Sequence, residues 1–102
     1  MLQFIKNILG IKDTDYKKLI QNGAQIIDVR SPQEYKSGHI KNSKNIPLQT
    51  LSSKLKSFPK NKAIITVCAS GIRSANAKGI LKTQGFDAYN GGAWQQLQNK
   101  IS

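Results

Sequence analysis

The sequence contains very few cysteine, histidine and acidic residues, and each shortage excludes a class of protein. One cysteine and one histidine occur in 102 residues, so no internal disulfide can form and a zinc site of three or four ligands would need carboxylates. Hydrophobic runs long enough to cross a bilayer are also missing. We therefore expect one globular domain, without a membrane span or structural metal, that is stabilised by its core alone.

The shortage of acids leaves a formal net charge of +11, from sixteen lysines and arginines against five aspartates and glutamates. The basic residues are scattered in ones and twos from Lys6 to Lys100, with no dense block and no interleaved aromatic motif of the RNA-binding kind. This distribution argues against specific nucleic-acid recognition. It favours a surface that attracts a small anionic substrate.

The first ten residues, MLQFIKNILG, are apolar but interrupted by Lys6. They are too short to span a membrane and lack the small-residue cleavage pattern of a signal peptide. We interpret residues 1–10 as a short helical extension of a cytoplasmic protein, with a weak interfacial anchor as the alternative. The domain itself is expected over residues 11–102.

Hydrophobic periodicity predicts that strands alternate with helices. Strands are expected near Ile11 and over residues 24–30, 44–46, 63–67 and 86–89. Helices are expected after a cap at Asp13 or Thr14, after Ser31, and over residues 48–58, 74–83 and 93–101. Such alternation implies parallel βαβ units, and so a three-layer α/β/α domain around a central, mostly parallel sheet of about five strands.

The segment SPQEY carries the signature of a helix start. Ser31 is placed as the N-cap, Pro32 as the first helical residue and Glu34 as the partner that completes a capping box. This helix follows a strand that ends in Asp28 and Arg30. Because ligands of parallel sheets bind at the carboxyl ends of strands, these two residues and Cys68 are expected at a common edge.

The segment from Cys68 to Ser74 has the composition of an anion-binding loop. Backbone amides that turn toward a helix N-terminus converge on one point and stabilise negative charge there. Arg73 adds a cation, Gly71 permits an inward-turned amide and Ser74 offers a hydroxyl, so we expect a lowered pKa for Cys68. The alternative from the residues alone is an inert, buried thiol at the end of a strand.

Three stretches resemble the motifs of the rhodanese-like sulfurtransferase family. IIDVRSPQEYKSGHIKNSKNIP is similar to the first signature of that family, VCASGIRSANAKGILKTQGF to its active-site loop and following helix, and YNGGAW to its closing glycine pair and tryptophan. The resemblance covers roughly residues 11–98. It implies a single-domain sulfurtransferase in which Cys68 accepts and carries sulfane sulfur, with no metal or organic cofactor.

The length of the cysteine loop bears on the reaction. Four residues separate Cys68 from Arg73, one fewer than in the Cys-based phosphatases and arsenate reductases of this fold, which surround a tetrahedral oxyanion. The shorter loop favours a terminal persulfide sulfur. The expected reaction is thiolate attack on a small anionic donor such as thiosulfate, followed by sulfur transfer to cyanide, a thiol or a sulfur-relay protein. The loop residues expected to stabilise the persulfide are Ala69, Ser70, Gly71, Ile72, Arg73 and Ser74.

Two alternatives remain open. The chain is a non-enzymatic sulfur carrier or regulatory module that docks a protein partner, or, less favoured by the loop length, a Cys-based phosphatase or arsenate reductase. We expect a monomer in each case. Ala69 is small and uncharged where many members of the family carry a side chain that selects the substrate.

Residues outside the loop are assigned mainly by their place in the motifs. The resemblance gives Asp28 a structural role near the site, and Arg30 is a possible substrate contact or the partner of Glu34 or another acid. His39 is expected to fix its own loop, since thiolate chemistry needs no strong base. The glycine pair, Gly91 and Gly92, is expected to mark a close backbone approach near the site.

Overall fold

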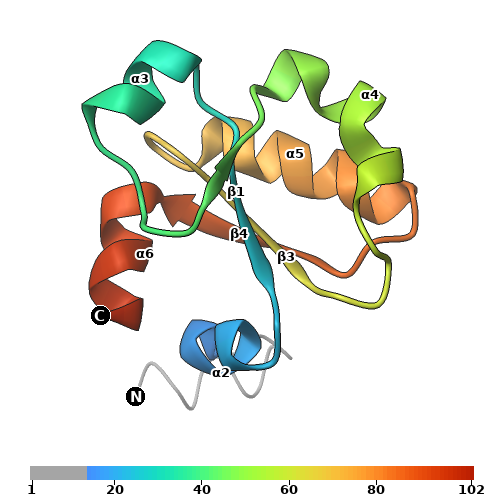
Figure 1. Cartoon of the computed structure of the whole chain (residues 1–102), viewed down its shortest axis with the longest axis horizontal. Helices are drawn as coiled ribbons and strands as arrows, with labels where there is room; N and C mark the ends of the chain where they lie inside the picture. Colours follow the sequence, from blue (N-terminus) through green and yellow to red (C-terminus); the bar gives the residue numbers. More distant parts are fainter. Residues whose placement is uncertain (1–13) are drawn as a thin grey trace, which may run out of the picture.

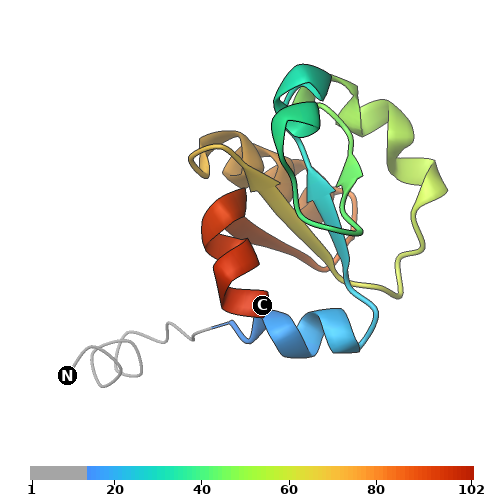
Figure 2. The same ribbon diagram turned by 60° about the vertical axis from the view of Figure 1, so that its left-hand side comes forward.

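The computed structural model describes residues 14–102, and the expected extension over residues 1–10 and the extended piece near Ile11 lie outside this range. The described chain forms a parallel sheet with helices on both faces (Figures 1 and 2). Its elements are α2 (Tyr16–Gln21), β1 (Gln25–Asp28), α3 (Pro32–Ser37), β2 (Lys44–Asn45), the 3₁₀ turn η1 (Leu48–Thr50), α4 (Leu51–Lys54), the 3₁₀ turn η2 (Leu55–Ser57), β3 (Ile64–Cys68), α5 (Ile72–Thr83), β4 (Ala88–Ala93) and α6 (Trp94–Ile101).

The strand order is β2-β1-β3-β4, and every neighbouring pair is parallel. The expected α/β/α class with a parallel sheet is therefore confirmed, with four strands in residues 14–102 against about five expected. All five side chains of β3 are buried, as its continuous β-branched sequence predicts for an inner strand. Strand β4 runs further than expected and includes both glycines of the pair.

Alternate side chains of the strands supply two separate hydrophobic layers, as the two-residue period of a strand requires. One layer packs under α4 and α5 and contains Ile27, Val29, Ile46, Leu51, Phe58, Ile64, Cys68, Ala77, Leu81, Phe86 and Ala88. The other packs under α2 and α6 and contains Ile26, Ile40, Ile65, Val67 and Leu97. Figure 2 shows α6 and α4 on opposite sides of the sheet.

The start of α3 agrees with the sequence, and that of α2 differs by one or two residues. Ser31 accepts a hydrogen bond from the Glu34 amide and Glu34 accepts one from the Ser31 amide, which confirms the capping box of α3. The cap of α2 was expected at Asp13 or Thr14 but is Asp15, whose carboxylate accepts from the Lys18 amide. The expectation was wrong because residues 13–15 all carry a side-chain oxygen that can cap a helix, and the sequence does not show which of them is used.

The expected helix over residues 48–58 is broken into η1, α4 and η2. Hydroxyls of Thr50, Ser53 and Ser57 each donate to the carbonyl three residues earlier. These local bonds compete with the α-helical pattern and favour tighter turns. The apolar spacing predicted the buried face correctly, since Leu51 is fully buried, but the serines and threonine decide the backbone.

Helix α5 begins at Ile72, two residues before the expected start, because Gly71 serves as the N-cap with a φ of 101°. Its buried positions are Ser74, Ala77 and Leu81. The small residues Ala75, Ala77 and Gly79 predict close approach to the sheet; Ala77 is buried, but Ala75 and Gly79 are exposed. No helix within residues 14–102 is long and apolar enough to cross a membrane.

Candidate active site

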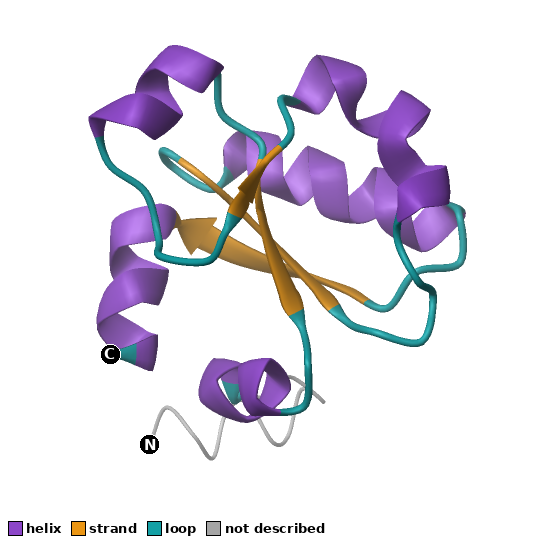
Figure 3. Ribbon diagram, viewed as in Figure 1, coloured by secondary structure: helices purple, strands orange, loops and turns teal. Residues whose placement is uncertain are grey.

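The turn from β3 into α5 lies at the carboxyl edge of the sheet, at the same end as α3 (Figures 1 and 3). Cys68 is the last residue of β3, and Asp28 is the last residue of the neighbouring strand β1. The structure thus brings the two sequence-predicted regions to one edge, as the parallel arrangement requires.

The Cys68 sulfur is both enclosed and hydrogen-bonded. Its side chain belongs to the core layer under α5 and is fully buried, so the description as a buried thiol holds. The backbone amides of Gly71 and Ser74 nevertheless donate to Sγ over 3.0 and 3.3 Å, and the Ser74 hydroxyl oxygen lies 3.3 Å from it. Three polar groups of one short segment therefore converge on the sulfur.

These contacts decide how readily Cys68 ionises. Burial raises the pKa of the thiol, but the hydrogen bond with the Ser74 side chain and those from the amides of Ser74, Gly71 and Ser70 more than offset it and leave the pKa of Cys68 lowered. The pKa of Cys68 is thus lowered by nearby hydrogen-bonding dipoles. Such an arrangement stabilises a thiolate or a persulfide anion.

Gly71 makes this arrangement possible. Its φ of 101° lies in the left-handed region that favours glycine, and this conformation turns its amide toward Sγ. A Cβ at this position would lie 3.5 Å from the Gly92 Cα, so the loop rests on the backbone of β4. Of the other loop residues, Ala69 and Ser70 are exposed.

Asn90 of β4 is a site residue that the sequence did not reveal. Its Oδ1 accepts from the Ser74 hydroxyl over 2.6 Å and from the Gly92 amide over 2.9 Å, and its Nδ2 donates to the Gly71 carbonyl over 3.2 Å. Thr66 adds a further bond from β3, from its hydroxyl to the Ser74 carbonyl over 2.7 Å. The available signal was a polar residue directly before the glycine pair.

Arg73 does not donate to the sulfur. It forms a bidentate ion pair with Glu34 of α3, at 2.8 and 3.0 Å, although Glu34 was expected only to cap its helix. The hydrogen bonds from Arg73 and from the Ser31 amide lower the pKa of Glu34 to about 2, and Glu34 in turn raises the pKa of Arg73. The pair ties α3 to the start of α5.

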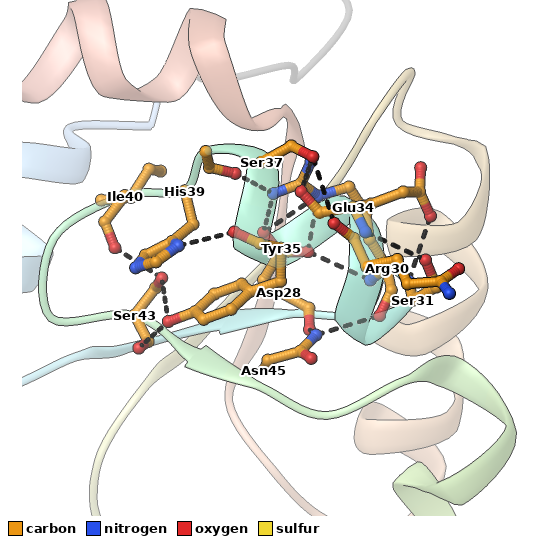
Figure 4. Close-up of polar contacts among 12 residues, drawn as sticks. Asp28, Arg30, Ser31, Glu34, Tyr35, Ser37, His39, Ile40, Ser43 and Asn45 are labelled. Carbon is orange, nitrogen blue, oxygen red and sulfur yellow. Dashed lines mark hydrogen bonds and ion pairs between the residues drawn. The ribbon is translucent and has the colours of Figure 1, made fainter.

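The other arginine, Arg30, is enclosed beside the site. Its guanidinium binds both carboxylate oxygens of Asp28 and donates to the carbonyls of Glu34 and Gly38 (Figure 4). It also lies 5.0 Å from the centroid of a Trp94 ring. Of the two roles considered for Arg30, the ion pair is the one that the structure shows, with Asp28 as the acid. The Arg30 guanidinium is thus held by Asp28 and by two backbone carbonyls.

His39 lies on the far side of α3 from these contacts, stacked on the Tyr35 ring at 3.7 Å (Figure 4). Its Nδ1 is 2.7 Å from the Tyr35 carbonyl oxygen, and a carbonyl can only accept, so Nδ1 carries a proton. His39 is exposed and anchors the turn after α3, with no hydrogen bond to the cysteine loop.

The two glycines of β4 are needed for different reasons, Gly91 for lack of space and Gly92 for its backbone conformation. A Cβ on Gly91 would lie 2.9 Å from the Ile65 Cγ2 and 3.0 Å from the Thr66 carbonyl oxygen, so that position has no room for a side chain. Gly92 instead has a φ of 80° and open space around it. The register with β3 shifts between Asn90 and Gly92 and leaves Gly91 without a partner, and the Gly92 amide donates to Asn90. Among residues 14–102, no three histidine, cysteine or acidic side chains cluster as metal ligands.

The comparisons with known proteins agree with this geometry. The family description "Rhodanese-like domain" matches residues 12–98, and the chain belongs to that family. It is 33% identical over 75 residues to the thiosulfate sulfurtransferase GlpE of Pseudomonas paraeruginosa, covering 72% of this chain and 68% of the relative. Among solved structures, a rhodanese with anions from E. coli is 30% identical with a TM-score of 0.68, covering 72% of this chain and 89% of that one.

A second curated relative is longer than this chain. The uncharacterized protein YqhL of Bacillus subtilis is 37% identical over 68 residues, which are 66% of this chain but 54% of that protein. The chain therefore spans about half the length of that relative. The family places the chain among sulfurtransferase-like proteins.

Proposed function

We propose that the protein is a sulfurtransferase that carries sulfane sulfur on Cys68. The observation that carries this proposal is the convergence of the Gly71 amide, the Ser74 amide and the Ser74 hydroxyl oxygen on Sγ, in a segment where only four residues separate Cys68 from Arg73. Neutral donors around a buried sulfur stabilise a thiolate and a persulfide without neutralising either by a fixed cation.

The proposed reaction has two displacements. The Cys68 thiolate attacks the outer sulfur of thiosulfate, the new S–S bond forms, and the bond to the sulfonate breaks with its electron pair leaving on sulfite. A thiolate acceptor, or cyanide, then attacks the outer sulfur of the persulfide and returns Cys68 to the thiolate. The GlpE relative is named for this donor, and the positive charge of the chain favours approach of an anion.

Intact-mass measurement after thiosulfate treatment tests the proposal directly. We expect wild-type protein to gain the mass of one sulfur atom and to lose it on addition of cyanide, with sulfite released in equal amount. Because Cys68 is the only cysteine, Cys68→Ser is a clean control and should gain nothing. An unchanged wild-type mass, or an equal gain in Cys68→Ser, would exclude the reaction. A reduced thiol is required, which favours the cytoplasm as its location.

A second candidate, sulfur relay to a protein partner, is supported by Ile72. Among residues 14–102 it is the one exposed large hydrophobic side chain, 77% accessible, and it lies in the cysteine loop as the first residue of α5. Exposed apolar side chains beside a reactive group are suited to contact with another protein. If relay is the function, cell extract should discharge the Cys68 persulfide faster from wild type than from Ile72→Ser, while discharge by cyanide stays equal in both. Equal discharge by extract would favour the small-molecule reaction.

A further inference from the structure

The orientation of the Asn90 side chain is fixed by two backbone groups. Its Oδ1 lies 2.9 Å from the Gly92 nitrogen, and its Nδ2 lies 3.2 Å from the Gly71 carbonyl oxygen. A backbone N–H can only donate and a carbonyl oxygen can only accept, so the amide cannot be turned over without losing both bonds. The carbonyl oxygen of Asn90 therefore faces Ser74.

This orientation also fixes the Ser74 hydroxyl. Ser74 Oγ lies 2.6 Å from Asn90 Oδ1, which only accepts, so the single hydroxyl proton of Ser74 points at Asn90. The lone pairs of Ser74 Oγ are then left to face Cys68 Sγ at 3.3 Å, with the thiol as donor. The chain of hydrogen bonds runs from Cys68 to Ser74 to Asn90.

That direction suits a thiol and opposes a thiolate. A thiolate has no proton to donate, and an oxygen that presents lone pairs to it is repelled. On ionisation the thiol proton leaves to solvent, and the Ser74 hydroxyl must turn from Asn90 to Sγ before it can stabilise the charge. When the hydroxyl rotates, Asn90 Oδ1 loses the hydrogen bond from Ser74 but keeps the one from the Gly92 amide.

We propose that Asn90 is a positioning residue that controls the ionisation of Cys68 through the Ser74 hydroxyl, holding its proton away from the sulfur until the thiol ionises. The proposal rests on Cys68 being the reactive thiol of the proposed function. It concerns ionisation and not sulfur transfer, so the two can fail separately.

The charged groups around the sulfur are a separate influence. Arg73 of α5 is paired with Glu34 of α3. The charge of Arg73 also interacts with Cys68 and with Asp28 of β1. Asp28 is in turn held by Arg30. Variants at Ser74 and Asn90 that introduce no charge leave all four groups in place, so a change in the titration of Cys68 can be assigned to the hydroxyl.

The test is the titration of Cys68, followed by the ultraviolet absorbance of the thiolate with Cys68→Ser as the blank. In Asn90→Ala the hydroxyl is freed for the sulfur, and the thiolate-to-thiol ratio at fixed pH should rise by about three- to tenfold. In Asn90→Asp a carboxylate holds the hydroxyl proton more strongly and the ratio should fall. Both variants lose the bond to the Gly71 carbonyl, so that loss is matched.

The same variants in a Ser74→Ala background complete the test. Without the hydroxyl, Asn90→Ala should leave the titration unchanged, and the effect of Asn90→Asp should shrink to that of its charge. If Asn90→Ala does not fold, the comparison of Asn90→Asp with Asn90→Asp/Ser74→Ala decides. The proposal then requires that Asn90→Asp change the Cys68 titration less when the Ser74 hydroxyl is absent. Shifts in one direction in both variants, or shifts that are the same with and without Ser74, would mean that Asn90 only supports the loop and would overturn the proposal. None of these readouts requires a sulfur donor.

Discussion

Two neighbouring strands end at the same edge of the sheet, and they handle negative charge in opposite ways. At the end of β1 the Asp28 carboxylate is fully buried and bound by the Arg30 guanidinium at 2.8 Å. At the end of β3 the Cys68 sulfur is equally buried, but amide and hydroxyl dipoles surround it, and the nearby Arg73 is paired with Glu34. The permanently charged Asp28 carboxylate is therefore bound by a cation, whereas the Cys68 sulfur, which is charged only as a thiolate or persulfide, is surrounded by neutral polar groups.

The largest expected effect lies at the β1 end. Asp28→Ala leaves the Arg30 guanidinium buried without its counter-ion, and we expect the free energy of unfolding in urea to fall by about 3–5 kcal/mol. The double variant Asp28→Ala/Arg30→Met removes both charges and should recover most of that loss. A single variant as stable as wild type would show that Asp28 is not the fixed counter-ion that the comparison requires.

The packing of β4 against β3 is tested at Gly91. A Cβ there would press on Ile65 and on the Thr66 carbonyl of β3, so Gly91→Ala should lower the free energy of unfolding by about 1–3 kcal/mol. Gly79→Ala is the matched control, because nothing lies within 4 Å of its Cβ position and alanine stabilises a helix by roughly 0.5–1 kcal/mol over glycine. Equal effects at the two positions would contradict the close approach.

The β3 end is tested by Ser74→Ala, which removes the hydroxyl that turns to Sγ when the thiol ionises and leaves the backbone amides. The pKa of Cys68 should rise, and alkylation of the thiol by iodoacetamide at neutral pH should slow by about three- to tenfold. Ser70→Ala, which changes an exposed side chain in the same loop, should leave the rate unchanged. Similar rates in wild type and Ser74→Ala would show that the amides alone stabilise the thiolate.

The smallest effect is expected for the Arg73–Glu34 pair, whose side chains are 37% and 38% exposed. The folded state lowers the pKa of Glu34 from 4.5 to about 2, so the pair stabilises the fold above pH 4.5 and this contribution is lost as pH falls toward 2. Because solvent screens the pair, the contribution should stay below about 1 kcal/mol. Thermal unfolding of Glu34→Gln, which keeps the capping geometry, should match wild type at low pH and be slightly less stable at neutral pH. A constant difference across this range would contradict the assignment.

The capping box of α3 and the alternation of strands and helices could be predicted because both depend on residues close in sequence. The convergence of amides near Cys68 could be predicted from its spacing to Gly71 and Ser74. The partners of Ser74 and Arg73 could not. Asn90 of β4 meets Ser74 across 16 positions, and Glu34 meets Arg73 across 39 positions. Such contacts follow from packing, which local patterns do not specify.

In the cysteine loop, which lies close to Gly92, the groups that hold the sulfur are different from the side chains that face an approaching molecule. The sulfur is held by main-chain amides and by the Ser74 hydroxyl, in a loop that lies close to the backbone of β4, whereas the side chains of Ala69, Ser70 and Ile72 are exposed. Substitutions at these three positions can change which molecules approach the loop without moving the atoms that hold the sulfur. The loop is therefore evolvable in its choice of partner while its chemistry stays fixed.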